Sequence, residues 1–390
     1  MYRVSCLISK INIINVNYQD VVTKKIKNEG EQVEMKRILV INIGSTSSKI
    51  AYYKNRDCIF SENLLHDIEV IRRYPDLMDQ YQLRYDTLID FLDSKKVSIN
   101  DLDCVISRGG HTKPLAGGVY RINDLMIQQS ISKKYGFHAC DLGLQIARYI
   151  SGVTGAIALT ANPPVTDEFE PFARYSGLPE IKRVSAFQAL NHKSVSKKYA
   201  KDEGRCYEGL NLIVIHMGGG ISVVAHKKGR MIDGNNALFG DGPFSTNRSG
   251  GLPVGGLIEL CFSGKYTQAE MLKMVTEQGG LIAYVGDHDV QKIEDLAKSD
   301  PKCREVLDAM CYQVAKEIGA ASTVLKGKVD AIIMTGGMAN SKYVTETIKE
   351  RISFIGPVKI YPGEFEMESL ADNAYNALTG VEEVKEFENK

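Results

Sequence analysis

Short apolar runs, each followed by a glycine turn, recur along the chain. Four of them occupy residues 38–43, 102–107, 212–217 and 329–334. A continuous apolar run of this length between turn residues is typical of a buried strand. Segments with the apolar spacing of a helix lie between and after these runs, at residues 75–96, 137–151, 190–200, 253–262, 268–278, 302–326, 341–351 and 366–380. The alternation of buried strands and helices predicts an α/β protein.

The order of these elements is repeated in the two halves of the chain. Residues 38–43 match residues 212–217 at an offset of 174, and a Lys-x-Arg sequence follows each copy at the same offset. Residues 102–110 match residues 329–337 at an offset of 227, and both end in Gly-Gly. Two matches in the same order argue against chance and predict a β-β-β-α-β-α-β unit present twice. We therefore expect two duplicated α/β domains facing a central cleft, with ligands at the glycine turns.

Composition limits the partners of the protein. The 390 residues carry 48 basic and 48 acidic side chains, so the formal net charge is zero and binding to nucleic acid or to an anionic membrane is not expected. The eight cysteines form no C-x-x-C pair, and no apolar run is long enough to span a membrane, which predicts a cytoplasmic protein. Residues 1–34 lack the apolar core of a signal peptide, and we expect a disordered extension or a mis-assigned start.

Two of the glycine turns have the composition of a phosphate site. Residues 44–48 read Gly-Ser-Thr-Ser-Ser, directly follow the first strand and are followed by Lys49. Such a turn offers backbone N–H groups, hydroxyl donors and a cation, which a terminal phosphate needs. The second half carries Gly218, Gly219 and Gly220 in the equivalent place. Two like turns facing one cleft predict a polyphosphate that is held from both sides. The chain contains neither a P-loop nor a G-x-G-x-x-G helix start, the two common phosphate-binding motifs.

Several turns carry motifs of a known family. Residues 42–49, 216–220, 247–250 and 336–340 resemble the acetate and butyrate kinase family, within the sugar kinase, Hsp70 and actin superfamily. Motifs that resemble butyrate kinases in particular occur at residues 108–110, 179–181, 248–255 and 361–364. The resemblance covers about residues 35–385 and implies two ribonuclease-H-like (actin-like ATPase) domains. The expected domains are an N-terminal one of residues 35–161 plus 366–390 and a C-terminal nucleotide-binding one of residues 162–365.

The resemblance implies ATP-dependent phosphorylation of a short-chain carboxylate, butyrate or a branched-chain relative, to an acyl phosphate. The reaction is expected to be reversible, to need Mg²⁺ and to take place in a homodimer or larger homo-oligomer. A carboxylate is already ionised at pH 7, so its attack on a γ-phosphate brings two anions together, and the protein must supply positive charge and alignment rather than a strong base. Arginine suits this task because its planar fork binds carboxylate and phosphoryl oxygens in pairs.

The same resemblance implies roles for individual residues. Arg108, at the end of an apolar strand, and Arg248, in a glycine-rich segment, are expected to be catalytic. His138 is expected to contact the substrate, and Asn162 and Glu364 are expected to hold the metal. The expected phosphate-binding residues are Asn42, Ser45, Ser47, Lys49, His216, Gly218, Gly219 and Gly220, and the expected nucleotide-binding residues are Gly336, Gly337 and Asn340.

Two expected catalytic positions depart from the family pattern. Asn162 stands where the family has an Asp that assists the metal or the phosphoryl group, and Gln188 stands where it has a His thought to support the transition state. An amide brings no charge to a metal, and Gln never becomes cationic. Asp167, Glu168 and His192 are neighbours able to compensate.

These departures leave a second function open. The alternative is a catalytically weakened, nucleotide-binding regulatory or interaction protein on the same scaffold. A sugar kinase is disfavoured, because the Arg-Gly-Gly strand end and residues 247–255 suit an anion better than a polyol.

Overall fold

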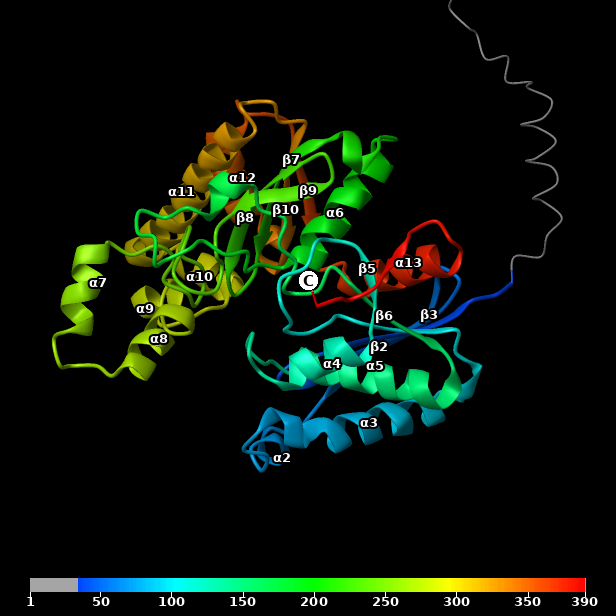
Figure 1. The fold of residues 1–390 in the computed structure, drawn as a ribbon. Helices are drawn as coiled ribbons and strands as arrows, with labels where there is room; N and C mark the ends of the chain where they lie inside the picture. The colour runs from blue at the N-terminus through cyan, green and yellow to red at the C-terminus, as the bar shows by residue number, and fades with distance from the viewer. Residues whose placement is uncertain (1–33, 390) are drawn as a thin grey trace, which may run out of the picture. The chain divides into compact units, whose positions relative to one another are not determined.

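One sheet, in which Figure 1 labels the strands β2, β3, β5 and β6, is built around β1 (Arg37–Ile43). β1 is an apolar strand that is buried along almost its whole length. The computed structural model describes residues 34–389. Within them, the strand order of this sheet is β12-β5-β6-β4-β1-β2-β3. The bounds of the other strands are β2 (Ser47–Lys54), β3 (Asp57–Leu65), β4 (Cys104–Ser107), β5 (Val119–Arg121), β6 (Ile157–Ala161) and β12 (Val384–Lys385). β1 pairs antiparallel with β2 and parallel with β4, so it joins a hairpin to a parallel pair.

Helices pack against both faces of this first sheet. α3 (Tyr81–Ser94), α4 (Asp124–Ile131) and α5 (Cys140–Thr154) contribute to the apolar cluster on one face. α13 (Glu366–Leu378) packs on the other face, where Leu370 lies in the cluster formed by alternate residues of β1. The C-terminal helix therefore packs against the first sheet.

The second sheet is built from strands that are apolar on both faces. Its order is β11-β10-β7-β8-β9. The bounds of its strands are β7 (Asn211–Met217), β8 (Ile221–Lys227), β9 (Arg230–Gly234), β10 (Ala331–Gly336) and β11 (Val358–Pro362). α11 (Pro301–Val324) and α12 (Lys342–Ile352) cover one face, and α6 (Ala189–Asp202) covers the other. Burial on both faces explains why β7 and β10 read as continuous apolar runs.

The two sheets confirm the predicted repeat. In each of them a three-stranded meander is extended by two parallel strands, in the orders β3-β2-β1-β4-β6 and β9-β8-β7-β10-β11. The glycine turns after β1 and β7 therefore occupy equivalent positions. The boundaries predicted for the two domains remain a prediction.

Several short elements do not follow from the apolar pattern. β5, β12 and α4 were not predicted, nor were the short helices α2 (Ile68–Ile71), α9 (Leu281–Val285) and α10 (Val290–Leu296). The helices expected at residues 253–262 and 268–278 are present as α7 (Val254–Cys261) and α8 (Gln268–Thr276). Across residues 34–389, every helix is too short or too polar to cross a bilayer. The prediction for residues 1–34 falls, except for its last residue, outside the described residues.

Candidate active site

A cavity of about 290 Å³ opens beside the end of β4 and the turn between β7 and β8. Its walls come from both halves of the chain. Eight predicted site residues line it, namely Arg108, Gln188, His216, Gly218, Gly219, Gly220, Arg248 and Glu364. The other predicted residues do not line this cavity, and they are Asn42, Ser45, Ser47, Lys49, His138, Asn162, Gly336, Gly337 and Asn340.

Arg108 is held at this cavity by residues from distant parts of the chain. Its guanidinium donates a hydrogen bond to Oε1 of Gln188, and its Nε lies 3.4 Å from Oε1 of Glu366. Asn42 donates from Nδ2 to the other oxygen of Glu366 at 2.8 Å. Burial lowers the pKa of Arg108, but nearby acidic groups, Glu366 first, raise it more, so the net shift is upward. Gln188 and Asn42 therefore orient Arg108, directly and through Glu366.

Arg248 lies against the second glycine turn. Its Nη1 donates to the carbonyl oxygen of Ala237 at 2.6 Å, and its backbone N–H donates to Oγ of Ser245 at 3.2 Å. Ser245 in turn donates to the carbonyl of Gly219, which ties the arginine loop to the turn. The buried Nε of Arg248 finds no acceptor among the described residues. Burial lowers the pKa of Arg248. A buried cationic donor without a partner is costly, and an anionic ligand would satisfy it.

His216, the sixth residue of β7, is fixed in one orientation. Its Nδ1 lies 2.8 Å from Nδ2 of Asn191, so the amide donates and the ring nitrogen accepts. Oδ1 of Asn191 accepts the backbone N–H of Phe365 at 3.1 Å. Burial lowers the pKa of His216, which favours the neutral ring. Nδ1 accepts, so the neutral ring carries its proton on Nε2, the atom on the side of Gly218.

Arg84 supports the first glycine turn from inside the protein, and sequence reasoning missed it. Its Nη2 donates to the carbonyl of Ser45 at 2.8 Å, and its Nη1 donates to the carbonyl of Ser47 at 3.1 Å. The Ser47 carbonyl also accepts the N–H of Gly44 at 2.8 Å. Burial lowers the pKa of Arg84 to about 10, so the side chain stays charged at neutral pH. The available sequence signal was an arginine on an otherwise apolar helix face, four residues after Gln80, to which it donates a hydrogen bond.

The substrate candidate His138 belongs to a cluster built on Asp141, a fully buried carboxylate. Asp141 accepts the backbone N–H and Nδ1 of His111 at 2.7 and 2.8 Å, Oγ of Ser130 at 2.6 Å and the backbone N–H of His138 at 2.9 Å. Hydrogen bonds that the His111 ring donates, to Asp141 first and to Cys140 second, raise the pKa of His111 to about 10. Nε2 of His138 reaches Oγ of Ser45 at 3.3 Å.

This cluster contains the metal-ligating set His111, Cys140 and Asp141, whose ligand atoms lie within 4.8 Å of one another. Each oxygen of Asp141 already accepts two hydrogen bonds. Burial raises the pKa of the Cys140 thiol, but its hydrogen bonds with His111 and His138 lower it more, and the net shift is downward. The cluster therefore positions two loops beside the cavity rather than offering free metal ligands.

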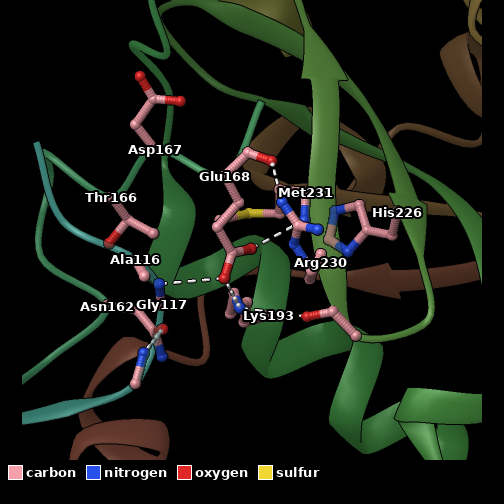
Figure 2. Close-up of polar contacts among 12 residues, drawn as sticks. Ala116, Gly117, Asn162, Thr166, Asp167, Glu168, Lys193, His226, Arg230 and Met231 are labelled. Atoms are coloured by element: carbon pink, nitrogen blue, oxygen red, sulfur yellow. Dashed lines mark hydrogen bonds and ion pairs between the residues drawn. The ribbon is translucent and has the colours of Figure 1, made fainter. Parts of the chain in front are cut away.

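Asn162 and its acidic neighbours each bond to a different partner (Figure 2). Oδ1 of Asn162 accepts the N–H of Gly118 at 2.9 Å. Asp167 turns away and forms a bidentate ion pair with Arg174 at 2.6 and 2.9 Å. Glu168 belongs to a buried hydrogen-bond network. Because Asp167 and Glu168 are both paired elsewhere, these contacts do not favour either of them as a replacement for the missing charge at Asn162.

Glu168 joins three segments of the chain. Its Oε1 accepts Nζ of Lys193 at 2.8 Å and the N–H of Gly117 at 3.0 Å, and its Oε2 accepts the N–H of Met231 at 2.8 Å (Figure 2). The side chains of Lys193 and Glu168 are only 9% and 7% exposed. His192, the third candidate for compensation, is fully buried and bonded to Oγ of Ser222 at 2.7 Å.

Other predicted residues lie just after β11 and in the segment that follows β10. Glu364 is half exposed, and its Oε2 lies 3.3 Å from Nζ of Lys49. Gly336 has a φ of +90°, and a Cβ there would lie 2.4 Å from the carbonyl of Met217, so the turn after β10 needs glycine. Gly337 has open space where a Cβ would stand, and Asn340 donates to its carbonyl at 3.0 Å. An open glycine of this kind leaves room for a flat group to approach the backbone.

Residues 180–374 match the model of the acetokinase family. The chain is 47% identical over 352 residues to butyrate kinase 2 of Clostridium acetobutylicum, covering 90% of this chain and 99% of that protein. The structure is similar to that of Porphyromonas gingivalis acetate kinase, with a TM-score of 0.72, 18% identity and coverage of 89% of this chain and 100% of that one.

A propionate kinase from Francisella tularensis is also similar, with a TM-score of 0.66, 18% identity and coverage of 87% of this chain and 99% of that one. At these identities the structural likeness shows the fold alone. It confirms the predicted actin-like ATPase fold.

Proposed function

The chain belongs to the acetokinase family, and we propose that it transfers the γ-phosphoryl group of ATP to a short-chain carboxylate, butyrate or a branched-chain relative, to form an acyl phosphate reversibly. The observation that carries this proposal is Arg248, whose buried Nε has no acceptor within residues 34–389 and lies at the wall of a cavity that Arg108 also lines. Two guanidinium groups at one small cavity suit two anions that must approach each other.

The two arginines are not equivalent. Arg108 is already neutralised in part by Glu366, and Gln188 accepts one of its hydrogen bonds. It therefore keeps a fixed direction, as a group that aligns a substrate oxygen must. Arg248 donates to the neutral carbonyl of Ala237, and its Nε has no acceptor in the described part of the chain, so its charge is available to the transferring phosphoryl group.

Apolar side chains at the same cavity support a carboxylate with an alkyl tail. Pro164, Phe187 and Leu238 line it beside the two arginines. They would take an alkyl chain out of water, whereas a sugar hydroxyl facing them would lose its hydrogen bonds.

The neighbouring turns support a proposal for the nucleotide and the metal. We propose that residues 44–48 and 218–220 bind the phosphates, and that Gly336, Gly337 and Asn340 border the nucleoside. Glu364 fits a Mg²⁺ ion held mainly by nucleotide phosphates, because its carboxylate is half exposed at the cavity. Asn162 fits less well, because its oxygen already accepts a hydrogen bond. Bound Mg²⁺ would neutralise charge on the phosphates.

We further propose a cytoplasmic homodimer or larger homo-oligomer.

Trapping of the acyl phosphate tests this function. Purified protein is incubated with ATP, Mg²⁺, butyrate and hydroxylamine, and the hydroxamate is measured. We expect hydroxamate with wild-type protein and a rate lower by about 10²–10³ with Arg248→Lys, which keeps the charge but loses the fork. ATP binding without hydroxamate for any carboxylate from acetate to valerate would favour the regulatory alternative.

A further inference from the structure

Arg84 is an anomaly among the buried charges of this protein. It is 1% exposed, and it donates five hydrogen bonds, all to neutral oxygens, on Gln80, Ser45, Ser47 and Ser48. No carboxylate within residues 34–389 forms an ion pair with it. A buried cation is normally paired, since removing it from water is expensive, and packing alone does not explain a lone one.

The position of Arg84 suggests what its charge serves. It projects from the first turn of α3 onto the inner side of residues 44–48, the turn proposed to bind phosphate. On the outer side of this turn, Ser45 and Thr46 are exposed. The charge therefore lies beneath the turn, on the side opposite to the solvent from which an anion would arrive.

The same hydrogen bonds orient the backbone of the turn. In a trans peptide the C=O and the following N–H point in opposite directions. Because the carbonyl of Ser45 points inward to Nη2 of Arg84, the N–H of Thr46 points outward. Arg84 thus turns one backbone donor towards the ligand side while adding a positive charge behind it.

We propose that Arg84 is a positioning residue for the terminal phosphates of the nucleotide, acting through the turn at residues 44–48. This inference rests on the proposed function, because that function places the phosphates at this turn. At the corresponding turn, residues 218–220, Arg248 lies on the side of the cavity. The two glycine turns would then each be backed by one arginine, and only Arg248 would touch the ligand.

Binding of ATP, measured by calorimetry without any carboxylate, tests the proposal. The variants are Arg84→Gln, which removes the charge, and Arg84→Lys, which keeps the charge but loses the fork. Arg183→Gln is the control, because Arg183 also donates to two main-chain carbonyls, those of Ala173 and Gly234 at 2.9 and 3.0 Å, and does not line the cavity. Arg183 differs from Arg84 in its ion pair with Asp233 at 3.0 Å.

We expect the ATP dissociation constant to rise at least tenfold in Arg84→Gln, to rise about threefold or more in Arg84→Lys, and to stay within twofold in Arg183→Gln. A folded Arg84→Gln that binds ATP within twofold of wild type would overturn the proposal, as would an equal loss in Arg183→Gln. If Arg84→Gln does not fold, Arg84→Lys decides in the same way. Wild-type protein that binds ATP but forms no acyl phosphate would refute the proposed function while leaving this test intact.

Discussion

Gly220 and Arg248 lie so close that a methyl group on residue 220 would stand 2.1 Å from Nη1 of the arginine. The same methyl group would lie 2.6 Å from the carbonyl oxygen of Ala237, which accepts the hydrogen bond of that Nη1. The absence of a side chain at residue 220 is therefore what allows Arg248 to lie across the turn.

Gly220→Ala should displace the guanidinium and lower kcat by about 10², because a shift of about 1 Å in a positioned group has this effect. Gly220 does not have a positive φ, so the change acts by contact and not by backbone strain. Gly255→Ala is the control in the same glycine-rich segment, since nothing lies within 4 Å of a Cβ at that position. Steady-state kinetics that show equal rates for the two variants would rule out this role of Gly220.

Asn162→Asp should lower the Mg²⁺ concentration that gives half-maximal rate. One carboxylate oxygen can still accept the N–H of Gly118, and the second replaces the amide nitrogen with a charged metal ligand. Repulsion from the phosphates opposes this effect, by about 4 kcal/mol for a charge pair at about 4 Å and an effective dielectric of about 20. We expect the intervening dication to outweigh it. An unchanged Mg²⁺ dependence would remove Asn162 from the metal site.

Lys193→Met should destabilise the fold by about 3–5 kcal/mol, because it leaves the buried Glu168 carboxylate without its cation. Lys298→Met is the matched control: its ion pair with Asp295 has the same kind of partner at 2.7 Å, but the side chains are 76% and 59% exposed. That change should leave the free energy of unfolding almost unchanged, because solvent screens an exposed ion pair. Chemical denaturation of both variants measures the difference, and similar losses would mean that burial of the Glu168 pair does not matter.

His111 should make stability depend on pH. Its pKa in the folded protein is raised from 6.5 to about 10, chiefly by the hydrogen bond with Asp141. Protonated His111 stabilises the fold fully when the pH is below 6.5, the pKa of the unfolded state. This contribution is lost as the pH rises towards 10. The gap in Tm between wild type and His111→Gln should therefore be widest near about pH 6 and shrink towards about pH 10. A constant gap would show that the imidazolium is not the stabilising form.

The sequence predicted those features that depend on local pattern. β1 and β7 were found because strands buried on both faces are apolar at every position, and the glycine turns that follow them were found because few other residues fit there. β5 and β12 were missed because strands of three and two residues are too short for a period to show.

Side-chain partners across the fold could not be predicted in this way. Glu168 was considered for a role beside Asn162 because it is six residues away in sequence, yet it bonds to Gly117 and Met231 in other segments. Arg84 appeared to be an ordinary helix residue, because its acceptors at Ser45 and Ser47 are brought to it only by tertiary packing. Local sequence motifs therefore located the cavity, but they did not reveal the side-chain contacts that support it.

The central claim is that the γ-phosphoryl group is transferred to an oxygen of the carboxylate, and isotope labelling measures this transfer directly. The enzyme is incubated with ATP, Mg²⁺ and butyrate labelled with ¹⁸O in the carboxylate, and the product is observed by ³¹P NMR. In-line attack forms a bond between a carboxylate oxygen and the γ-phosphorus while the bridging oxygen leaves with ADP. We predict an acyl phosphate signal with the ¹⁸O isotope shift. Unshifted inorganic phosphate as the sole product would show transfer to water and contradict the account.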